Sequence, residues 1–193
     1  MKQPIRCGWC TSQPLYVEYY DSEWGVPEKD PLALFELLNL EGMQAGLSWW
    51  TVLSKREHMR KQFFGFDPNK LSNATESDVE GWLGDAGLIR HGGKLRAMIS
   101  NARCYLECED FTDLIWQSVD GKPVINQFGA MADVPAKTTA AEQLAKRLKK
   151  LGFRFVGPTT VYAFMQSAGL VNDHVLECEW HQKCARIAKD FHL

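Results

Sequence analysis

TAAEQLAKRLKKLGFRFVGPTTVYAFMQSAGLVNDH, residues 139–174, is the stretch that decides the fold. Apolar residues recur at helical spacing in both of its halves. Thr139 and Glu142 predict a capping box at the start of a first helix, and Gly152 predicts its end. Pro158 is suited to the first position of a second helix. We therefore predict a helix, a short hairpin and a second helix over about residues 139–174.

Glycines bound the predicted hairpin, and basic side chains flank it. Gly152 and Gly157 allow the backbone to approach another surface closely, and the free amides around Thr159, where the second helix begins, can bind an anion. The flanking basic residues are Lys146, Arg147, Lys149, Lys150 and Arg154. This arrangement suits a DNA phosphate. The alternatives are the solvated face of a helix for the basic residues and an ordinary α-hairpin for the glycines.

Helical spacing extends over most of the remaining chain, and alternating strand-like runs are scarce. Asp30 and Pro31 predict the cap and the first residue of one helix, and Thr75 with Asp78 predicts the capping pair of another. Further segments are a helix at about 48–63, a helix at about 91–108 and an irregular stretch at 118–137. The basic outer face predicted for the helix at 48–63 consists of Lys55, Arg56, Arg60 and Lys61. We therefore predict an all-α protein.

The length and composition are those of one globular unit. The 193 residues can bury one core, or two lobes that share an interface, so residues 1–193 are treated as a single unit. No apolar run resembles a signal peptide or is long enough to span a bilayer. We therefore expect a cytoplasmic monomer with no membrane partner. In a reducing compartment its six cysteines are core residues or metal ligands rather than disulfides.

The formal net charge of -2 is by itself weak evidence against a nucleic-acid partner. The two signs are segregated, however. Acidic residues crowd positions 18–36 and 107–113, whereas the basic residues that flank the hairpin lie in one block. Nucleic-acid binding therefore stays open.

Rare, tryptophan-rich strings carry a resemblance to a known family. Residues 152–175 resemble the helix-hairpin-helix of the DNA glycosylase superfamily that includes endonuclease III. The strings RCGWC (6–10), YVEYYDSEWGVP (16–27), LEGMQAGLSW (40–49), GLIRHGGKL (87–95) and GLVNDH (169–174) resemble the signatures of the DNA-3-methyladenine glycosylase I family. The matches run from about residue 6 to residue 178. They imply a two-lobed helical protein that flips a methylated adenine out of double-stranded DNA, cuts its N-glycosidic bond and releases free 3-methyladenine.

The resemblance places Glu41, Tyr19 and Trp49 in the pocket for the flipped base, with Trp24 nearby. Glu41 is the implied catalytic residue, because a carboxylate accepts a hydrogen bond from the adenine amino group and attracts a cationic purine. Aromatic faces stack on the base with added cation–π attraction. The alternatives are a surface position for Glu41, as is usual in a last helical turn, and a core position for Trp49.

The turn at residues 44–47 resembles the wedge loop of the superfamily. Gln44, Gly46 and Leu47 are the implied DNA contacts, and Leu47 or its neighbours fill the hole that the flipped nucleotide leaves. The alternative is a plain helix–helix turn with Leu47 packed inward.

Two positions indicate how the chemistry differs from that of other superfamily members. Thr159 stands in the region where strand-cutting members carry a lysine that forms a Schiff base, so we expect base release without strand cleavage. Asn172 stands where the superfamily usually has its catalytic aspartate. An amide is a poor general base, so strain and base recognition must suffice. N3-methylation makes adenine cationic and a good leaving group, which reduces the help required.

The resemblance also implies one structural zinc per chain. The family binds it with an N-terminal cysteine, a histidine and a C-terminal His-x-x-x-Cys. Cys7, His174 and Cys178 match three of these ligands, but Tyr20 stands where the family has its remaining histidine. A phenol is a poor zinc ligand, because it must lose a proton with a pKa of about 10.

Cys10 is the predicted fourth ligand, because Cys7-x-x-Cys10 has a common zinc-binding spacing. The ion would tie the N-terminus to the C-terminal segment. The alternatives are His181 or Cys184 as the fourth ligand, or no zinc.

Two other functions remain in competition with the glycosylase. One is a non-enzymatic, zinc-stabilised binder of alkylated DNA, which Asn172 favours and the pocket residues disfavour. The other is a hydrolase with a catalytic zinc, which would need an open coordination position. Release of free base from alkylated DNA, with and without chelator, distinguishes the three.

Overall fold

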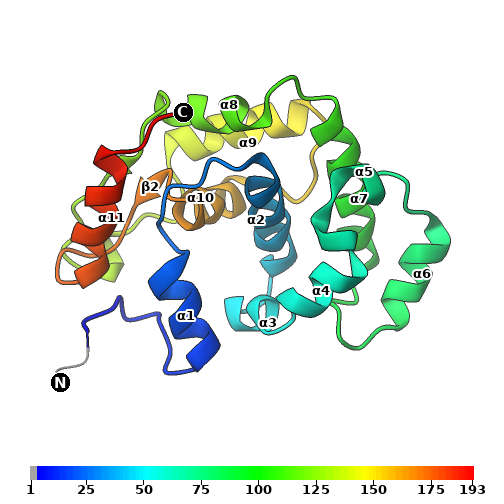
Figure 1. The fold of residues 1–193 in the computed structure, drawn as a ribbon, viewed down its shortest axis with the longest axis horizontal. Helices are drawn as coiled ribbons and strands as arrows, with labels where there is room; N and C mark the ends of the chain where they lie inside the picture. Colours follow the sequence, from blue (N-terminus) through cyan, green and yellow to red (C-terminus); the bar gives the residue numbers. More distant parts are fainter. Residues whose placement is uncertain (1–3) are drawn as a thin grey trace.

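A computed structural model describes residues 4–193, and the chain is mostly helical (Figure 1). Helices α9 (Thr139–Lys150) and α10 (Pro158–Ser167) pack against each other and are joined by a short connection. Helix α2 (Pro31–Gln44) also packs against α10, which therefore lies near the middle of the molecule. The two helices predicted within residues 139–174 are confirmed.

The other helices lie on two sides of this centre (Figure 1). One side holds α4 (Arg56–Gln62), α5 (Pro68–Leu71), α6 (Glu76–Gly84) and α7 (Gly92–Leu106). The other side holds α1 (Pro14–Ser22) and α11 (Glu179–Lys189), together with the N-terminal segment. Helix α3 (Trp49–Leu53) follows α2, and α8 (Phe111–Trp116) precedes the long irregular stretch. Short 3-10 turns occupy Phe64–Phe66, Gln117–Val119 and Met131–Asp133.

Two short strands qualify the all-α prediction. Strand β1 (Val124–Ile125) pairs in parallel with β2 (Val171–Asn172). Gly169 ends α10 with a φ of +67° and turns the chain toward β2. Any side chain at Gly169 would lie 2.4 Å from the backbone of Val26, so only glycine permits this close turn. The pairing ties the irregular stretch 118–137 to the segment after α10.

Most of the predicted caps are present. Asp30 accepts hydrogen bonds from the amides of Leu32 and Ala33 at the start of α2, and Thr75 with Asp78 forms a capping box on α6. The predicted cap of α9 was off by one residue. Thr138 accepts from the amide of Ala141.

The predicted helix at 48–63 is wrong in its middle, where the chain breaks into α3 and α4 around residues 54–55. The predicted basic outer face is also wrong at Arg56, of which only 8% is exposed. Its guanidinium donates to Glu36 and Glu23, at 2.7 Å each. A buried ion pair needs such a geometry, and the break turns Arg56 inward to reach it.

The buried apolar side chains form one continuous core through both sides of the molecule. Trp116, Phe35 and Phe164 are among its largest fully buried members. Within residues 4–193, no helix combines the length and the apolar character needed to cross a bilayer.

Candidate active site

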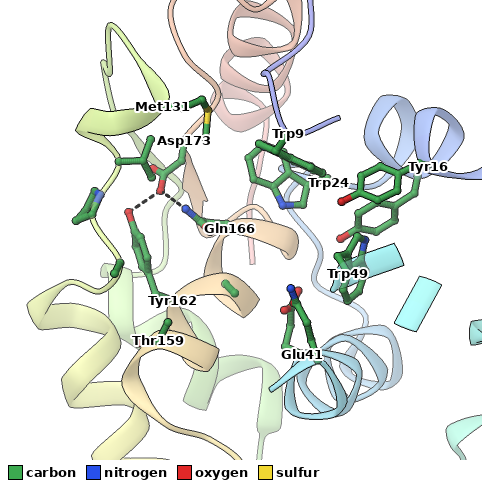
Figure 2. A pocket seen from close by; sticks show the side chains of 16 residues that line it. Trp9, Tyr16, Trp24, Glu41, Trp49, Met131, Thr159, Tyr162, Gln166 and Asp173 are labelled. Carbon is green, nitrogen blue, oxygen red and sulfur yellow. Dashed lines mark hydrogen bonds between the residues drawn. The ribbon is translucent and has the colours of Figure 1, made fainter. Parts of the chain in front are cut away.

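A pocket of about 450 Å³ opens between α1, α2, α10 and the irregular stretch (Figure 2). This volume is within the range of small-molecule sites. Its walls are formed by Trp9, Tyr16, Tyr19, Trp24, Glu41, Gln44, Trp49, Met131, Val134, Pro135, Ala136, Thr159, Tyr162, Ala163, Gln166 and Asp173. All four residues predicted for a base pocket, Tyr19, Trp24, Glu41 and Trp49, therefore line one cavity.

Glu41 lies in the last turn of α2, yet only 5% of it is exposed. Burial raises the pKa of its carboxyl to about 8, and a hydrogen bond with Ser167 opposes the rise. The neighbouring Gly42 allows the end of α2 to pack on the hairpin, where a side chain would lie 3.3 Å from Cβ of Phe155. Glu41 is thus not a surface residue, and its carboxyl is mostly protonated at pH 7 in the free protein.

The rings of Tyr19 and Trp49 form an aromatic wall of the pocket, with ring centres 5.1 Å apart. Trp49 lies beside Glu41 (Figure 2). Within residues 4–193, Nε1 of Trp49 is the one buried side-chain nitrogen or oxygen that has no hydrogen-bond partner. A buried donor in that state costs about 1–3 kcal/mol. A pocket ligand with an acceptor would remove the cost. Trp49 therefore has the properties of a binding residue rather than of plain core.

The opposite wall centres on Asp173, of which 1% is exposed. Its Oδ2 accepts hydrogen bonds from Tyr162 Oη at 2.5 Å and Gln166 Nε2 at 2.8 Å (Figure 2). Its Oδ1 accepts from Asn126 Nδ2 at 2.7 Å. These bonds fix the irregular stretch against α10. Neither Asp173 nor Trp9 was predicted from the sequence. Their positions inside the strings GLVNDH and RCGWC were the available signals.

Asn172, which matches the superfamily's usual aspartate, has a structural role in this protein. It is 1% exposed and is not among the residues that line the pocket. Its Nδ2 donates to the carbonyl of His181 at 2.9 Å, and its Oδ1 accepts from the amide of His174 at 3.3 Å. Both ends of the amide are therefore used by backbone groups near the start of α11.

The turn after α2 presents Leu47 to solvent, with 42% of the residue exposed. Gly46 adopts a φ of +76°, which suits glycine. Lys94 holds this turn from α7, where it is 5% exposed. Its Nζ donates to the carbonyl oxygens of Met43 at 2.7 Å and Ala45 at 2.6 Å. The alternative of an inward-packed Leu47 is thereby excluded.

The two glycines of the hairpin between α9 and α10 have different surroundings. Gly152 has a φ of +98°, and any side chain there would lie 2.9 Å from Sγ of Cys104. Gly157 is the N-cap of α10, and Thr159 lines the pocket one turn later. The last turn of α9 carries Arg147, Lys149 and Lys150.

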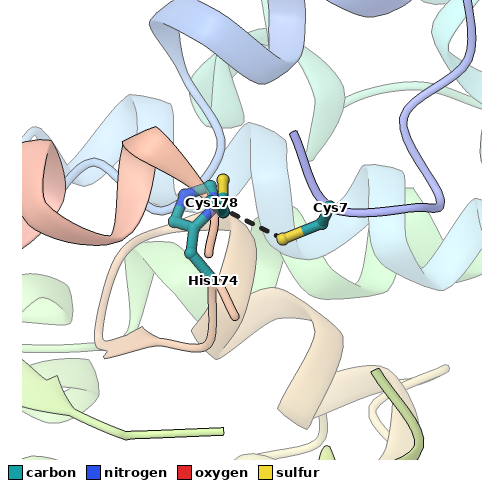
Figure 3. Close-up of side chains that lie close together, drawn as sticks. All are labelled: Cys7, His174 and Cys178. Atoms are coloured by element: carbon teal, nitrogen blue, oxygen red, sulfur yellow. Dashed lines mark hydrogen bonds between the residues drawn. The ribbon is translucent and has the colours of Figure 1, made fainter. Parts of the chain in front are cut away.

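A second polar cluster joins the two ends of the chain. The ligand atoms of Cys7, His174 and Cys178 all lie within 4.8 Å of one another (Figure 3). Nδ1 of His174 is 3.8 Å from Sγ of Cys7 and 3.6 Å from Sγ of Cys178. Hydrogen bonds from Cys7, and also from His174 and Tyr20, lower the pKa of the Cys178 thiol. Three of the four predicted zinc ligands are therefore brought together as a possible metal site.

The predicted fourth ligand does not reach this group. Sγ of Cys10 is directed to the carbonyl of Thr11 at 3.6 Å, because the turn after Cys7 carries it away. Nε2 of His181 is hydrogen-bonded to the carbonyl of Asn126 at 2.8 Å. Sγ of Cys184 lies 3.6 Å from Nε2 of His174, on the opposite edge of the ring from Nδ1. None of the three candidates completes a tetrahedron around Cys7, His174 and Cys178.

Tyr20 occupies the fourth side of the cluster instead. Its hydroxyl lies 2.9 Å from Nδ1 of His174 and 3.0 Å from Sγ of Cys178, and it accepts from the amide of Cys7 at 2.9 Å. A phenol at hydrogen-bond distance does not fit the closed four-ligand zinc site that the family implies. A catalytic metal does not fit either, because the cluster residues do not line the pocket.

Comparisons with known proteins identify the family of the chain. Residues 9–182 match the family model described as methyladenine glycosylase. The chain is 52% identical over 177 residues to DNA-3-methyladenine glycosylase 1 of Escherichia coli (strain K12), which covers 90% of this chain and 95% of the relative. A crystal structure of 3-methyladenine DNA glycosylase I matches with a TM-score of 0.90 at 51% identity and covers 91% of this chain and 98% of that one. A structure that concerns 3-methyladenine recognition by the Staphylococcus aureus enzyme matches with a TM-score of 0.87 at 38% identity, over 90% of this chain and 95% of that one. The chain belongs to the methyladenine glycosylase family.

Proposed function

We propose that this protein is a monofunctional DNA glycosylase that removes 3-methyladenine from alkylated double-stranded DNA. Family membership supports the reaction class. The observation that carries the proposal for this chain is the pocket itself, in which Glu41, a buried carboxyl, lies near Trp49, a buried donor without a partner. A ligand that offers an acceptor to Trp49 and a donor or positive charge to Glu41 stabilises both groups.

The pocket residues match the chemistry of the base. Glu41 accepts a hydrogen bond from the amino group of 3-methyladenine, and Trp49 donates through Nε1 to an acceptor on the purine. Tyr19 stacks beside the flipped base, with Trp24 on the adjoining wall. A 7-methylguanine presents an acceptor where Glu41 needs a donor, so the pocket disfavours it.

Because the pKa of Glu41 is raised, binding of the lesion is coupled to loss of the proton of its carboxyl. In the free protein the carboxyl is mostly protonated below pH 8, because burial disfavours its charge. In duplex DNA the N3-methylated adenine is a cation, and a cation beside the carboxyl favours the ionised form. Lesion binding therefore releases the proton of Glu41. The resulting carboxylate stabilises the positive charge until the glycosidic bond breaks.

Bond cleavage needs little covalent help from the protein. The electron pair of the glycosidic bond passes to the cationic base and neutralises it, and water adds to the sugar carbon and loses a proton. Within residues 4–193, no lysine lines the pocket. Lys94, which reaches the turn after α2, has its ammonium bound to two carbonyls. A Schiff base with the sugar is therefore not expected.

The surface beside the pocket suits a DNA duplex. Leu47 is exposed on a turn held by Lys94, as a residue that fills the space of a flipped nucleotide must be. Gln44 lies between this turn and the pocket. Gly152, Gly157 and Thr159 present the hairpin backbone and the start of α10 to a phosphate. These DNA contacts are part of the proposal.

Chromatography of bases released from methylated DNA tests the function. Purified protein is expected to release 3-methyladenine, to leave 7-methylguanine largely in place and to give no borohydride-trapped DNA adduct. Equal release of both bases would contradict the proposed specificity. Binding of the DNA without any release would favour the non-enzymatic binder instead.

A further inference from the structure

The hydroxyl of Tyr20 lies where polar groups from both ends of the chain meet. Tyr20 comes from α1, and its ring is fully buried. The hydroxyl accepts from the backbone amide of Cys7 and is hydrogen-bonded to His174 and Cys178. Cys7 precedes α1, whereas His174 and Cys178 lie between β2 and α11. One oxygen atom thus contacts both segments.

The distances within the cluster are of two kinds, spacings typical of ligands around one metal ion and spacings typical of hydrogen bonds. Zinc–ligand bonds of 2.0–2.3 Å imply ligand–ligand separations of about 3.3–3.8 Å in a tetrahedron. The separations of His174 Nδ1 from the sulfurs of Cys7 and Cys178, 3.8 and 3.6 Å, fall within or near that range. The separations of 2.9 and 3.0 Å that involve the Tyr20 oxygen are shorter and match hydrogen bonds.

The orientation of Tyr20 is fixed by aromatic packing. Its ring stacks on Trp24 at 5.8 Å with an interplanar angle of 16°, and it meets the edges of Trp9 at 4.9 Å and Trp180 at 5.6 Å. The ring of His174 packs on Trp24 as well, at 4.5 Å. The hydroxyl therefore cannot swing aside to admit an ion without a rearrangement of three tryptophans.

The two ends of the chain are also joined by contacts that need no ion. The backbones of Ile5 and Glu179 are linked by a hydrogen bond of 3.1 Å, and the amide of Ile5 donates to the Glu179 carboxyl at 3.1 Å. Arg6 pairs with Asp21 at 2.6 Å and lies over the ring of Trp180. A metal would add little to a junction held in this way.

We propose that Tyr20 replaces the metal ion in this chain. Its hydroxyl links Cys7 to His174 and Cys178 by hydrogen bonds and closes the junction between the N-terminal and C-terminal segments without zinc. The junction supports the pocket from behind, because Trp24 packs on Tyr20 and His174 and also lines the pocket. Its role is structural, and it is independent of the function proposed above.

Elemental analysis and thermal melting test this proposal on the full chain. Wild-type protein is loaded with zinc and dialysed, and it is expected to retain far less than one zinc per chain and to melt at the same temperature with and without chelator. Tyr20→Phe leaves polar groups of the cluster without their shared partner, so its melting temperature should fall by roughly 5 °C. Tyr105→Phe, a partly buried tyrosine outside the cluster, is the matched control and should melt like wild type.

Tyr20→His is the gain-of-function arm. It returns a nitrogen ligand to the fourth side, so the variant should bind close to one zinc, and cobalt loading should give the absorption of thiolate coordination. The proposal is overturned if wild type retains one zinc whose removal lowers its melting temperature. In that event, loss of the zinc in Cys10→Ser would identify Cys10 as the fourth ligand, and loss in Tyr20→Phe would identify a phenolate ligand. An unchanged melting temperature in Tyr20→Phe would overturn it as well.

Discussion

Two buried polar regions of this protein lie on either side of Trp24, and they differ in how their groups are satisfied. In the pocket, Nε1 of Trp49 has no partner and burial keeps a proton on Glu41. In the cluster behind it, the hydroxyl of Tyr20 bonds groups from both chain ends. Buried groups without partners cost free energy, so they persist where a ligand completes them. Satisfied groups hold the fold together. This difference supports the proposed assignment of the pocket as a binding site and of the cluster as a structural junction.

Substitution of Glu41 is expected to have the largest effect on activity. Glu41→Gln keeps the shape but removes the charge, so release of 3-methyladenine should fall by about 10²-fold or more, as when a transition-state contact is lost. The melting temperature should not fall, because burial disfavours the charged form of the Glu41 carboxyl and the amide that replaces it is neutral. Base release and melting are measured together. Glu177→Gln, an exposed glutamate, is the control. Wild-type rates for Glu41→Gln would remove Glu41 from the site.

The pH dependence of activity and of stability tests whether the lesion requires ionised Glu41. If lesion binding requires ionised Glu41, kcat/KM should rise about tenfold per pH unit below the pKa of about 8 and level off above it. Stability should change in the opposite sense. A folded pKa of about 8, raised above the ordinary value of 4.5, contributes stability that is fully present below about pH 4.5 and is lost as pH rises through about 8. Glu41→Gln should flatten both profiles. A flat wild-type rate profile would contradict the proton coupling.

Lys94 should matter for opening a duplex but not for recognising the base. Lys94→Met leaves the carbonyls of Met43 and Ala45 without their donor and loosens the turn that carries Leu47. Release from an intact duplex should fall about tenfold. A lesion opposite an abasic site should suffer less, because the base is already unpaired. Lys189→Met, on the exposed face of α11, is the control. Equal losses on both substrates would show a general folding defect.

Asn172 offers the smallest expected effect. Asn172→Asp restores the superfamily's usual residue but places a carboxylate oxygen against the carbonyl of His181. The melting temperature should fall by several degrees, with no gain in base release, since the side chain is not on the pocket wall. Asn73→Asp makes the same chemical change at an exposed site and should be neutral. A faster Asn172→Asp enzyme would mean that this position reaches the substrate.

The sequence predicts the helices well where the capping chemistry is local. Asp30 with Pro31, and Thr75 with Asp78, cap helices as predicted, because a cap involves residues only a few positions apart. The inward position of Arg56 after the break at residues 54–55 could not be predicted, because its partners Glu23 and Glu36 lie in distant segments of the sequence.

The residues of the candidate site also divide into those that the sequence predicts and those that only the fold brings together. Glu41, Tyr19 and Trp49 lie inside strings that resemble the family, so they could be named from the sequence. Asp173 was missed because its importance arises from bonds to Asn126 and from α10, which only the fold brings together. The spacing of Cys7 and Cys10 favoured a ligand pair, but the turn between them directs the two sulfurs apart. A spacing rule carries no information on such a turn.

Thermal melting with added 3-methyladenine tests the separation of the two regions most directly. A ligand that binds the folded state raises the melting temperature according to its affinity. The base should raise the melting temperature of wild type and of Tyr20→Phe by similar increments, although Tyr20→Phe starts from a lower value. It should raise that of Glu41→Leu, which has no acceptor for the amino group of the base, far less. Loss of the increment in Tyr20→Phe, with a normal increment in Glu41→Leu, would contradict the assignment of ligand binding to the pocket and of stability to the cluster.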